Sequence, residues 1–234
     1  MIFAMNGRTK QPRPIRRLHL FEFGDQRWLP SLLRNYLTEI LQYQITNYNL
    51  YMPAVGKLTE LLQRAHCNCL VDLCSGSGGA LFQLYELLKR ENIRVSIVLT
   101  DKFPDEKTID RLRQTPINDI RYFETSVEAT KVPQQLRGLR TLFTCFHHFQ
   151  PEEARLILMN AVLEKAPIGI FEFTERNMAN IIGMLLAPIA ILFQSKRLIP
   201  FKWSRIVLTY VFPVIPLLYW WDGTVSHLRT YTAQ

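Results

Sequence analysis

The stretch LVDLCSGSGG at residues 70–79 decides the fold of this chain. It starts as an apolar strand, passes through a turn of small residues and opens a helix. Glycines let a backbone pass close to a ligand, and a helix N-terminus offers unpaired N–H groups. The stretch therefore predicts a strand–loop–helix unit that holds a nucleotide-type ligand.

Strands and helices alternate after this unit, which is typical of a parallel sheet with helices on both faces. The expected strands lie near residues 69–73, 94–100, 119–124, 140–145 and 168–173, and the expected helices near residues 79–90, 105–114 and 151–165. The chain has 234 residues, which is long enough for one such domain with additions. The expected fold class is α/β, with a doubly wound and mostly parallel sheet.

A carboxylate follows the second expected strand directly, because residues 95–100 lead into Asp101. A carboxylate at that place accepts both hydroxyl groups of a ribose. Dinucleotide enzymes share this feature, but the third glycine of their G-x-G-x-x-G pattern falls at Leu81 here. The sequence therefore disfavours a dinucleotide site.

Two further motifs follow the third and fourth expected strands. The first is EATKVP at residues 128–133, and the second is LFTCFHHF at residues 142–149. Taken singly, the glycines also suit a tight turn, and Asp101 and Glu128 also suit helix caps. The order of the four motifs together favours a cofactor site.

In that order the motifs resemble those of the class I S-adenosylmethionine (SAM)-dependent methyltransferases of small-molecule type, over about residues 54–175. The resemblance implies a Rossmann-like sheet, SAM as the cofactor and methyl transfer as the reaction. Cys74 stands where the family usually has glycine, and Glu128 stands where aspartate is commoner. The implied cofactor-binding residues are Asp72, Cys74, Ser75, Gly76, Gly78, Asp101, Lys102, Glu128, Ala129 and Phe146.

Two histidines, His147 and His148, follow the fourth expected strand, at the edge where ligands of open α/β folds bind. Imidazole titrates near neutrality, so either ring is a candidate catalytic base. Equally, one ring would cap the next helix and the other would pack on the cofactor. No Asn/Asp-Pro-Pro-Tyr/Phe motif and no Pro-Cys motif is present, which disfavours methylation of adenine, glutamine and cytosine.

The chain divides into four expected regions: a basic flexible arm at 1–20, an N-terminal helical lid at 21–53, the SAM-binding domain at 54–175 and an apolar, basic helical region at 176–234. We expect two helices within residues 28–51. Tyrosines in the lid, Tyr43, Tyr48 and Tyr51, either cover the cofactor or pack in the core, and core packing is favoured.

The last region holds two apolar runs, residues 178–193 and 206–221, each shorter than the roughly 20 residues of a membrane-spanning helix. Aromatic residues lie near their ends, and the segment between Glu175 and Asp222 has basic residues but no acid. This pattern favours peripheral membrane or lipid contact, ahead of a buried acceptor pocket or a homodimer surface. The family closes its sheet with an antiparallel hairpin, which we expect to be incomplete here.

The net charge of +8 and the four cysteines bear on metal binding, cellular compartment and nucleic-acid binding. The Cys67-Asn68-Cys69 spacing lacks the second pair of a zinc knuckle, so no metal is expected. The sequence shows no signal peptide, which favours reduced thiols in the cytoplasm. The basic arm lacks interleaved aromatic residues, so nucleic acid is a disfavoured partner.

The function expected from these features is SAM-dependent methyl transfer to a small, hydrophobic or lipid-like acceptor. Two alternatives stay open: a catalytically inactive, membrane-docking scaffold and an RNA methyltransferase.

Overall fold

The computed structural model describes residues 2–4 and 15–232, and these form two compact units. We call the first the sheet unit; it holds residues 2–4 and Asn49–Phe173. We call the second the helical unit; it holds residues 15–48 and 174–232. Each unit has its own core and is described by itself.

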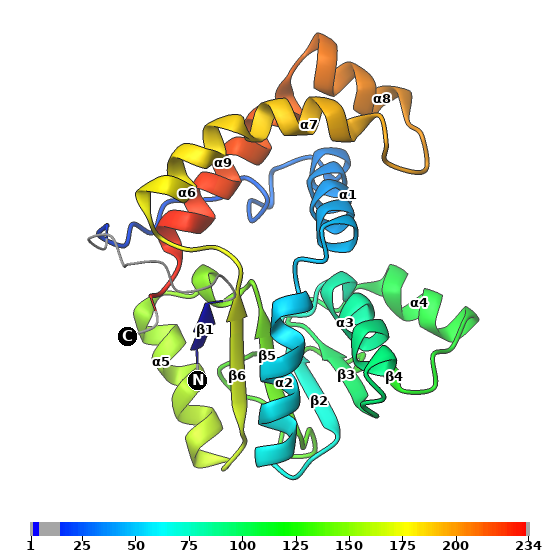
Figure 1. Ribbon diagram of the computed structural model, residues 1–234, viewed down its shortest axis with the longest axis vertical. Coiled ribbons are helices and arrows are strands. Elements are labelled where there is room, and N and C mark those ends of the chain that lie inside the picture. The colour runs from blue at the N-terminus through cyan, green and yellow to red at the C-terminus, as the bar shows by residue number, and fades with distance from the viewer. Residues whose placement is uncertain (1, 5–14, 233–234) are drawn as a thin grey trace. The chain divides into compact units, whose positions relative to one another are not determined.

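The sheet unit contains six strands, and every pair of neighbours is parallel (Figure 1). Their order across the sheet is β1-β6-β5-β2-β3-β4. The strands are β1 Ile2–Ala4, β2 Cys69–Leu73, β3 Ser96–Thr100, β4 Ile120–Tyr122, β5 Leu139–Phe143 and β6 Ile168–Glu172. The five strands after β1 confirm the expected α/β class and lie within a few residues of the predicted ranges.

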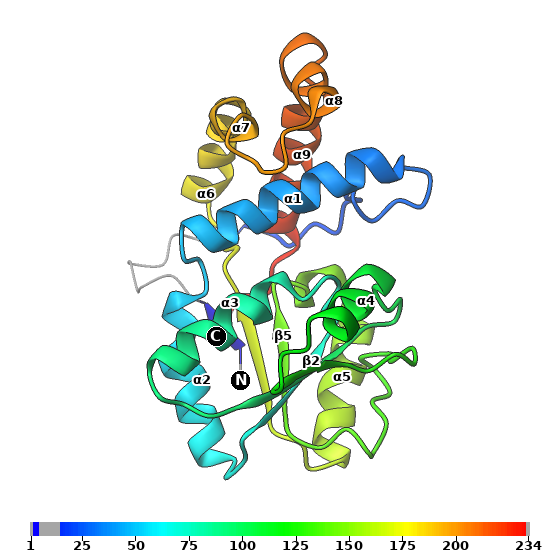
Figure 2. The ribbon, with the colours of Figure 1, turned by 90° about the vertical axis from the view of Figure 1, so that its right-hand side faces the viewer.

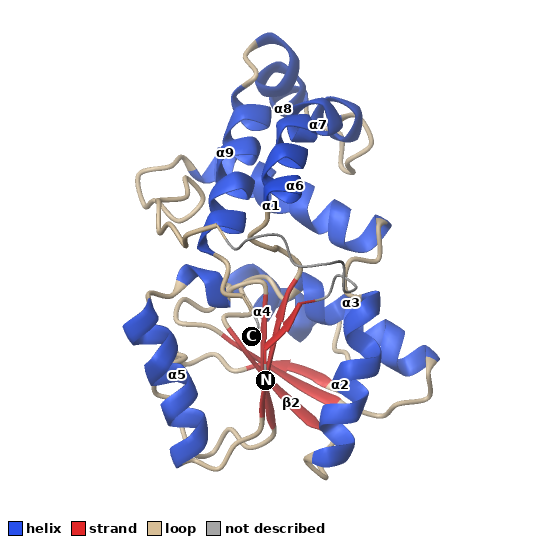
Figure 3. Ribbon diagram, turned by 60° about the vertical axis from the view of Figure 1, so that its left-hand side comes forward, coloured by secondary structure: helices blue, strands red, loops and turns tan. Residues whose placement is uncertain are grey.

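Helices cover both faces of this sheet, with α5 on one side and α2 and α3 on the other (Figure 3). The helices are α2 Met52–Arg64, α3 Gly79–Arg90, α4 Glu106–Gln114, the short 3₁₀ helix η1 Phe146–His148, and α5 Pro151–Leu163. Almost every residue of β2, β3, β5 and β6 is buried, as expected for parallel strands covered on both faces.

The N-terminal residues differ from the unstructured arm expected at 1–20, because Ile2–Ala4 form β1 and pair with β6. This pairing satisfies backbone groups that an open edge of β6 would leave exposed. The rest of the expected arm at 5–14 lies outside the described residues. No strand follows β6 within residues 173–232, so the described residues contain no closing antiparallel hairpin.

The helical unit combines one N-terminal helix with the C-terminal helices (Figure 2). The elements are α1 Ser31–Asn47, α6 Met178–Gly183, the 3₁₀ helix η2 Met184–Leu186, α7 Ala187–Ser195, α8 Trp203–Ile206, the π-helical η3 Val207–Val211 and α9 Val214–Arg229. Buried residues from four of its segments form the core: Tyr36, Ile40, Ile191, Leu198 and Ile215.

A single helix, α1, replaces the two that we expected within residues 28–51. No glycine or proline lies between Ser31 and Asn47, so nothing in that stretch breaks the helix. The helix ends in a turn where Asn49 has a φ of 48°, a left-handed conformation that asparagine tolerates.

The two apolar runs of the helical unit fold differently. Within the described residues, Met178–Ser195 is one helical stretch of 18 residues, long and apolar enough to cross a membrane. The second run is bent by 76° between Trp203–Val211 and Val214–Arg229, and would be a second span only if both parts counted together. Pro213 lies at that bend, where its ring prevents a continuous helix.

Asp222 on α9 holds the segment before α1 in place. Its carboxylate accepts hydrogen bonds from the backbone N–H groups of Phe23 at 2.6 Å and Gly24 at 2.9 Å. Arg229, about two helical turns further along α9, forms ion pairs with Glu22 and Asp25. Hydrogen bonds and ion pairs with Asp222 and Arg229 therefore hold residues 22–25 against α9, about 200 positions later in the sequence.

Candidate active site

The loop between β2 and α3 is anchored by the carboxyl group of Asp72, a residue that is only 1% exposed. Ser75 Oγ donates to Asp72 Oδ2 at 2.7 Å, and Thr141 Oγ1 on β5 donates to Asp72 Oδ1 at 2.8 Å. Thr100 Oγ1 on β3 donates to the Asp72 carbonyl oxygen at 2.8 Å. Asp72 therefore joins the loop to the strands on both sides of β2.

Burial raises the pKa of Asp72 to about 7, although the hydrogen bonds from Ser75 and Thr141 act in the opposite direction. Removing a carboxylate from water disfavours its charged form, and here that effect exceeds the gain from two hydroxyl donors. The native carboxyl therefore binds a proton more tightly than the unfolded one does, whose pKa is near 3.8.

This shift predicts that Asp72 lowers the stability of the protein as the pH rises from about 4 to about 7. The native state holds more protons than the unfolded state over that range, so the free energy of unfolding falls with increasing pH. In Asp72→Asn this contribution, up to about 4 kcal/mol, should be absent. Urea denaturation of both proteins across the range measures it. The exposed Asp110→Asn is the control, and parallel profiles for wild type and Asp72→Asn would contradict the prediction.

Three loop residues have left-handed backbones: Cys74 with φ of 61°, Gly76 with 50° and Gly78 with 68°. A Cβ atom at Gly78 would lie 2.8 Å from Leu99 Cδ1, so this glycine permits close packing of α3 on β3. At Gly76 a Cβ would meet nothing within 4 Å, so the space beside it is open. The left-handed angle of Cys74 gives the physical reason why glycine suits that position.

Asp101 directly follows β3 and contacts the backbone of the Gly-rich loop. Its Oδ2 accepts from the Gly76 N–H at 2.8 Å and its Oδ1 accepts from the Phe103 N–H at 2.8 Å. Tyr122 at the end of β4 donates its hydroxyl to the Gly76 carbonyl oxygen at 2.9 Å. The loop backbone at Gly76 is thus held by two neighbouring strands, beside the open space.

The segment after β4 lies next to the end of β3. The Val127 N–H donates to the Asp101 carbonyl oxygen at 2.9 Å. Lys102 and Glu128 form an exposed ion pair at 2.8 Å, and the hydrogen bond from Lys102 lowers the pKa of Glu128. Ala129 is buried. Two residues predicted to contact the cofactor therefore contact each other.

After β5 the chain turns through Thr144, which has a φ of 49°, into η1. Phe146 is buried, and its neighbour His147 is only 2% exposed. The His147 and His148 rings lie together, with centroids 4.3 Å apart. Tyr51 is buried in this part of the core and donates its hydroxyl to Thr144 Oγ1 at 3.0 Å, so it packs as a core residue.

His147 is paired with Glu172, the last residue of β6. His147 Nδ1 lies 2.9 Å from Glu172 Oε2, and the His147 N–H donates to Glu172 Oε1 at 3.2 Å. Both side chains are buried. Nδ1 of His147 is therefore held by a buried carboxyl group, the arrangement that orients the histidine of a catalytic triad.

Two thiols lie on neighbouring strand ends at the same edge. Cys145 Sγ donates to the Leu73 carbonyl oxygen at 3.7 Å, next to Cys74 in the chain. A hydrogen bond with Cys74, together with burial, raises the pKa of the Cys145 thiol well above its ordinary value. The Cys145 thiol therefore stays protonated at neutral pH and is a poor nucleophile.

All the predicted site residues thus lie at the carboxyl edge of the sheet, and hydrogen bonds link many of them. Four residues of this hydrogen-bond network were not predicted from the sequence: Thr100, Tyr122, Thr141 and Glu172. A signal existed for Glu172, since an acid ending an apolar strand resembles the Asp101 pattern. The threonines and Tyr122 gave no signal, because these residue types are ordinary in strands.

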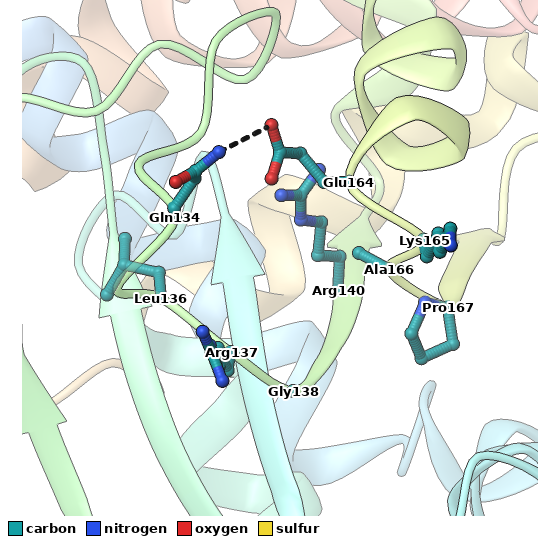
Figure 4. Close-up of a pocket in the computed structure, with 9 residues that line it drawn as sticks. All are labelled: Gln134, Leu136, Arg137, Gly138, Arg140, Glu164, Lys165, Ala166 and Pro167. Carbon is teal, nitrogen blue, oxygen red and sulfur yellow. Dashed lines mark hydrogen bonds between the residues drawn. The ribbon is translucent and has the colours of Figure 1, made fainter.

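A separate cavity of about 440 Å³ opens at the amino ends of β5 and β6, away from these residues (Figure 4). Arg140 is buried beside it and donates from Nη1 to Asn160 Oδ1 at 2.8 Å, and burial lowers the pKa of its guanidinium. The residues that line the cavity are Gln134, Leu136, Arg137, Gly138, Arg140, Glu164, Lys165, Ala166 and Pro167. None of them is a predicted site residue, so the cavity is not part of the candidate active site.

Comparison with known proteins gives structural likenesses only, since no family model and no curated protein matches the chain. The plantazolicin methyltransferase BpumL in complex with SAH is 12% identical over 87% of this chain and 67% of its own, with a TM-score of 0.49. A SAM-dependent methyltransferase from Aquifex aeolicus is 14% identical over 60% and 74%, with a TM-score of 0.40. The CMeT domain of the citrinin polyketide synthase is 16% identical over 56% of this chain, which spans 36% of that chain, with a TM-score of 0.40.

Scores this low do not assign an activity or a substrate. The strand order itself is informative: counted from β2, the strands lie in the order 3-2-1-4-5, with the Gly-rich loop after the central strand. The chain therefore has a doubly wound α/β fold with an all-parallel sheet, and its Gly-rich loop lies at the carboxyl end of the central strand.

Proposed function

We propose that this protein is a SAM-dependent methyltransferase that binds its cofactor at the carboxyl edge of the sheet. The observation that carries the proposal is the contact between Asp101 and the Gly76 N–H beside an open space. A carboxylate suits ribose hydroxyls, and the amides at the start of α3 suit a carboxylate. These groups therefore fit the ribose and the amino-acid carboxylate of SAM.

Each predicted cofactor-binding residue has its own role in this proposal. Asp101 receives the ribose, the chain at Glu128 and Ala129 faces the adenine, and Gly76 lets the backbone approach. Asp72 and Ser75 hold the loop in shape from below, because their side chains bond to each other. Lys102 positions Glu128 through the ion pair, while Cys74, Gly78 and Phe146 shape the loop and its surroundings.

When bound, SAM supplies a methyl group on a positively charged sulfur, which a nucleophile displaces in line. The chain must align the acceptor and remove its proton. His147 is the base in this proposal, since Glu172 holds its Nδ1 and so fixes the orientation of the ring. His148 contacts the His147 ring and positions it.

The acceptor that we propose is small and hydrophobic or lipid-like. The absence of Asn/Asp-Pro-Pro-Tyr/Phe and Pro-Cys motifs supports this choice, as does the large apolar surface of the helical unit. RNA remains the alternative acceptor, and the basic residues that would favour it lie mainly at 5–14, outside the described residues.

Calorimetric titration with SAM and with its demethylated product, S-adenosylhomocysteine (SAH), tests the cofactor. We expect micromolar binding of both at one site per chain. His147→Gln should bind SAM as the wild type does, but should transfer labelled methyl groups at least about 100-fold more slowly. The acceptors to compare are a lipid extract, apolar small molecules and RNA. Absence of SAM binding would contradict the proposal.

A second candidate is an inactive, methyltransferase-like scaffold, and the burial of His147 favours it because a covered base does not reach an acceptor directly. The same experiments separate the two functions. SAM binding without transfer to any acceptor class, unchanged in His147→Gln, supports the scaffold.

A further inference from the structure

One side of the Met178–Ser195 stretch is apolar and uncovered. Large hydrophobic residues recur along it at intervals of three and four, so they lie on one face of the helix. We call them the apolar face: Met178, Ile182, Leu185, Leu186, Ile189 and Phe193, all of them exposed. An exposed surface of this kind marks a contact site, since soluble proteins rarely leave so large a patch in water.

The opposite side of the same helix is already occupied. Ile191 is buried in the core of the helical unit with Ile40 and Ile215 from α1 and α9. The helix is therefore apolar on both sides, a pattern normally found where a helix is surrounded. Only 17% of this 18-residue window is buried, so a further apolar environment must cover the rest.

The chain between α7 and α8 (Figure 1) contains further aromatic and aliphatic residues. We call residues 196–203 the tip segment. Ile199 is 94% exposed, and Trp203 is 74% exposed with its ring packed edge-on against Phe201 at 5.2 Å. Exposed tryptophan and phenylalanine beside aliphatic residues are typical of helices that lie in a membrane interface.

Positive charge accompanies these apolar groups. Lys196 and Arg197 are exposed, and the segment between Glu175 and Asp222 contains no acid. The nearby carboxylate of Glu39 is already engaged by Lys202 at 2.5 Å and Arg205 at 2.8 Å. Two copies joined through this face would bring their cations together, which disfavours a second copy as the cover.

We infer that the apolar face and the tip segment dock into the surface of an anionic lipid bilayer. The stretch lies in the interface and does not cross it. By length and composition the stretch would suffice to cross a bilayer, but its inner side is packed against α1 and α9 and is not available to lipid. In addition, polar Gln194 on its inner side bonds to Gln44 of α1 at 2.9 Å. This inference does not depend on the proposed methyl transfer.

Vesicle flotation of the full chain tests the surface. The probes are vesicles of phosphatidylcholine alone and vesicles with about 30% phosphatidylserine, the anionic lipid that attracts basic segments. The wild type should float with the anionic vesicles. The triple variant Ile199→Ser, Phe201→Ser, Trp203→Ser should bind them at least about tenfold more weakly, because it loses the apolar groups that enter the acyl boundary.

Two matched variants sharpen the result. Val162→Ser with Leu163→Ser removes two equally apolar residues, each 75% exposed, from α5 of the sheet unit and should leave binding unchanged. Lys196→Gln with Arg197→Gln should weaken binding to anionic vesicles about 30-fold, the factor for two cations at about 1 kcal/mol each. Circular dichroism confirms that each variant is folded.

Three outcomes would overturn the inference. The wild type could fail to float with either vesicle, or the α5 control could lose binding as fully as the triple variant does. In the third outcome, light scattering shows that the wild type is a dimer, that the triple variant is a monomer and that neither binds vesicles. That outcome would assign the face to a second copy of the chain.

Discussion

Replacing Asp101 by alanine is expected to weaken SAM binding by at least about 100-fold while the protein stays folded. The carboxylate has two tasks in our proposal: it holds the Gly76 and Phe103 N–H groups at 2.8 Å each, and it receives the ribose. Hydrogen bonds to a charged group contribute about 1.5–3 kcal/mol each. The loss of two of them corresponds to the expected fall in affinity.

Calorimetric titration of the variant with SAM and SAH measures this effect. Asp110→Ala is the matched control, because Asp110 is an exposed carboxylate on α4, a few residues away, whose nearest partner is Arg113 at 3.4 Å. Asp101→Asn should show a smaller loss, since one acceptor oxygen remains. An Asp101→Ala variant that binds SAM as tightly as the wild type would rule out the ribose assignment.

Gly138→Ala should lower the free energy of unfolding by about 3 kcal/mol. Gly138 has a φ of 148°, and a Cβ there would lie 2.5 Å from the Cys69 carbonyl oxygen. Gly138 leads into β5 and Cys69 begins β2, so the new methyl group would push apart two strands that are paired in the centre of the sheet.

Gly56→Ala is the matched control for this substitution. Gly56 lies inside α2, where a Cβ would meet nothing within 4 Å. Alanine favours a helix over glycine, so this variant should gain up to about 1 kcal/mol. Urea denaturation of both variants measures the difference. Equal stability of Gly138→Ala and wild type would show that the backbone at this position relaxes easily.

Local sequence patterns predicted most of the sheet unit. The strand–loop–helix at residues 70–79 and the acid ending β3 depend on neighbours in the chain, so periodicity and small residues reveal them. The helical unit was harder to predict, because its core joins α1 to helices that lie far along the sequence. Residues 2–4 show no strand signal, and their pairing with β6 depends on the open edge of that strand.

The α/β class, the position of the Gly-rich loop and the residues at the carboxyl ends of the strands follow from local patterns in the sequence. Three other features depend on long-range packing: Asp101 holds Gly76, Glu172 pairs with His147, and one face of Met178–Ser195 is exposed. The reason is physical. Periodicity shows which residues are apolar, but which partner a charged group meets, and which apolar side stays in water, depend on how distant segments pack.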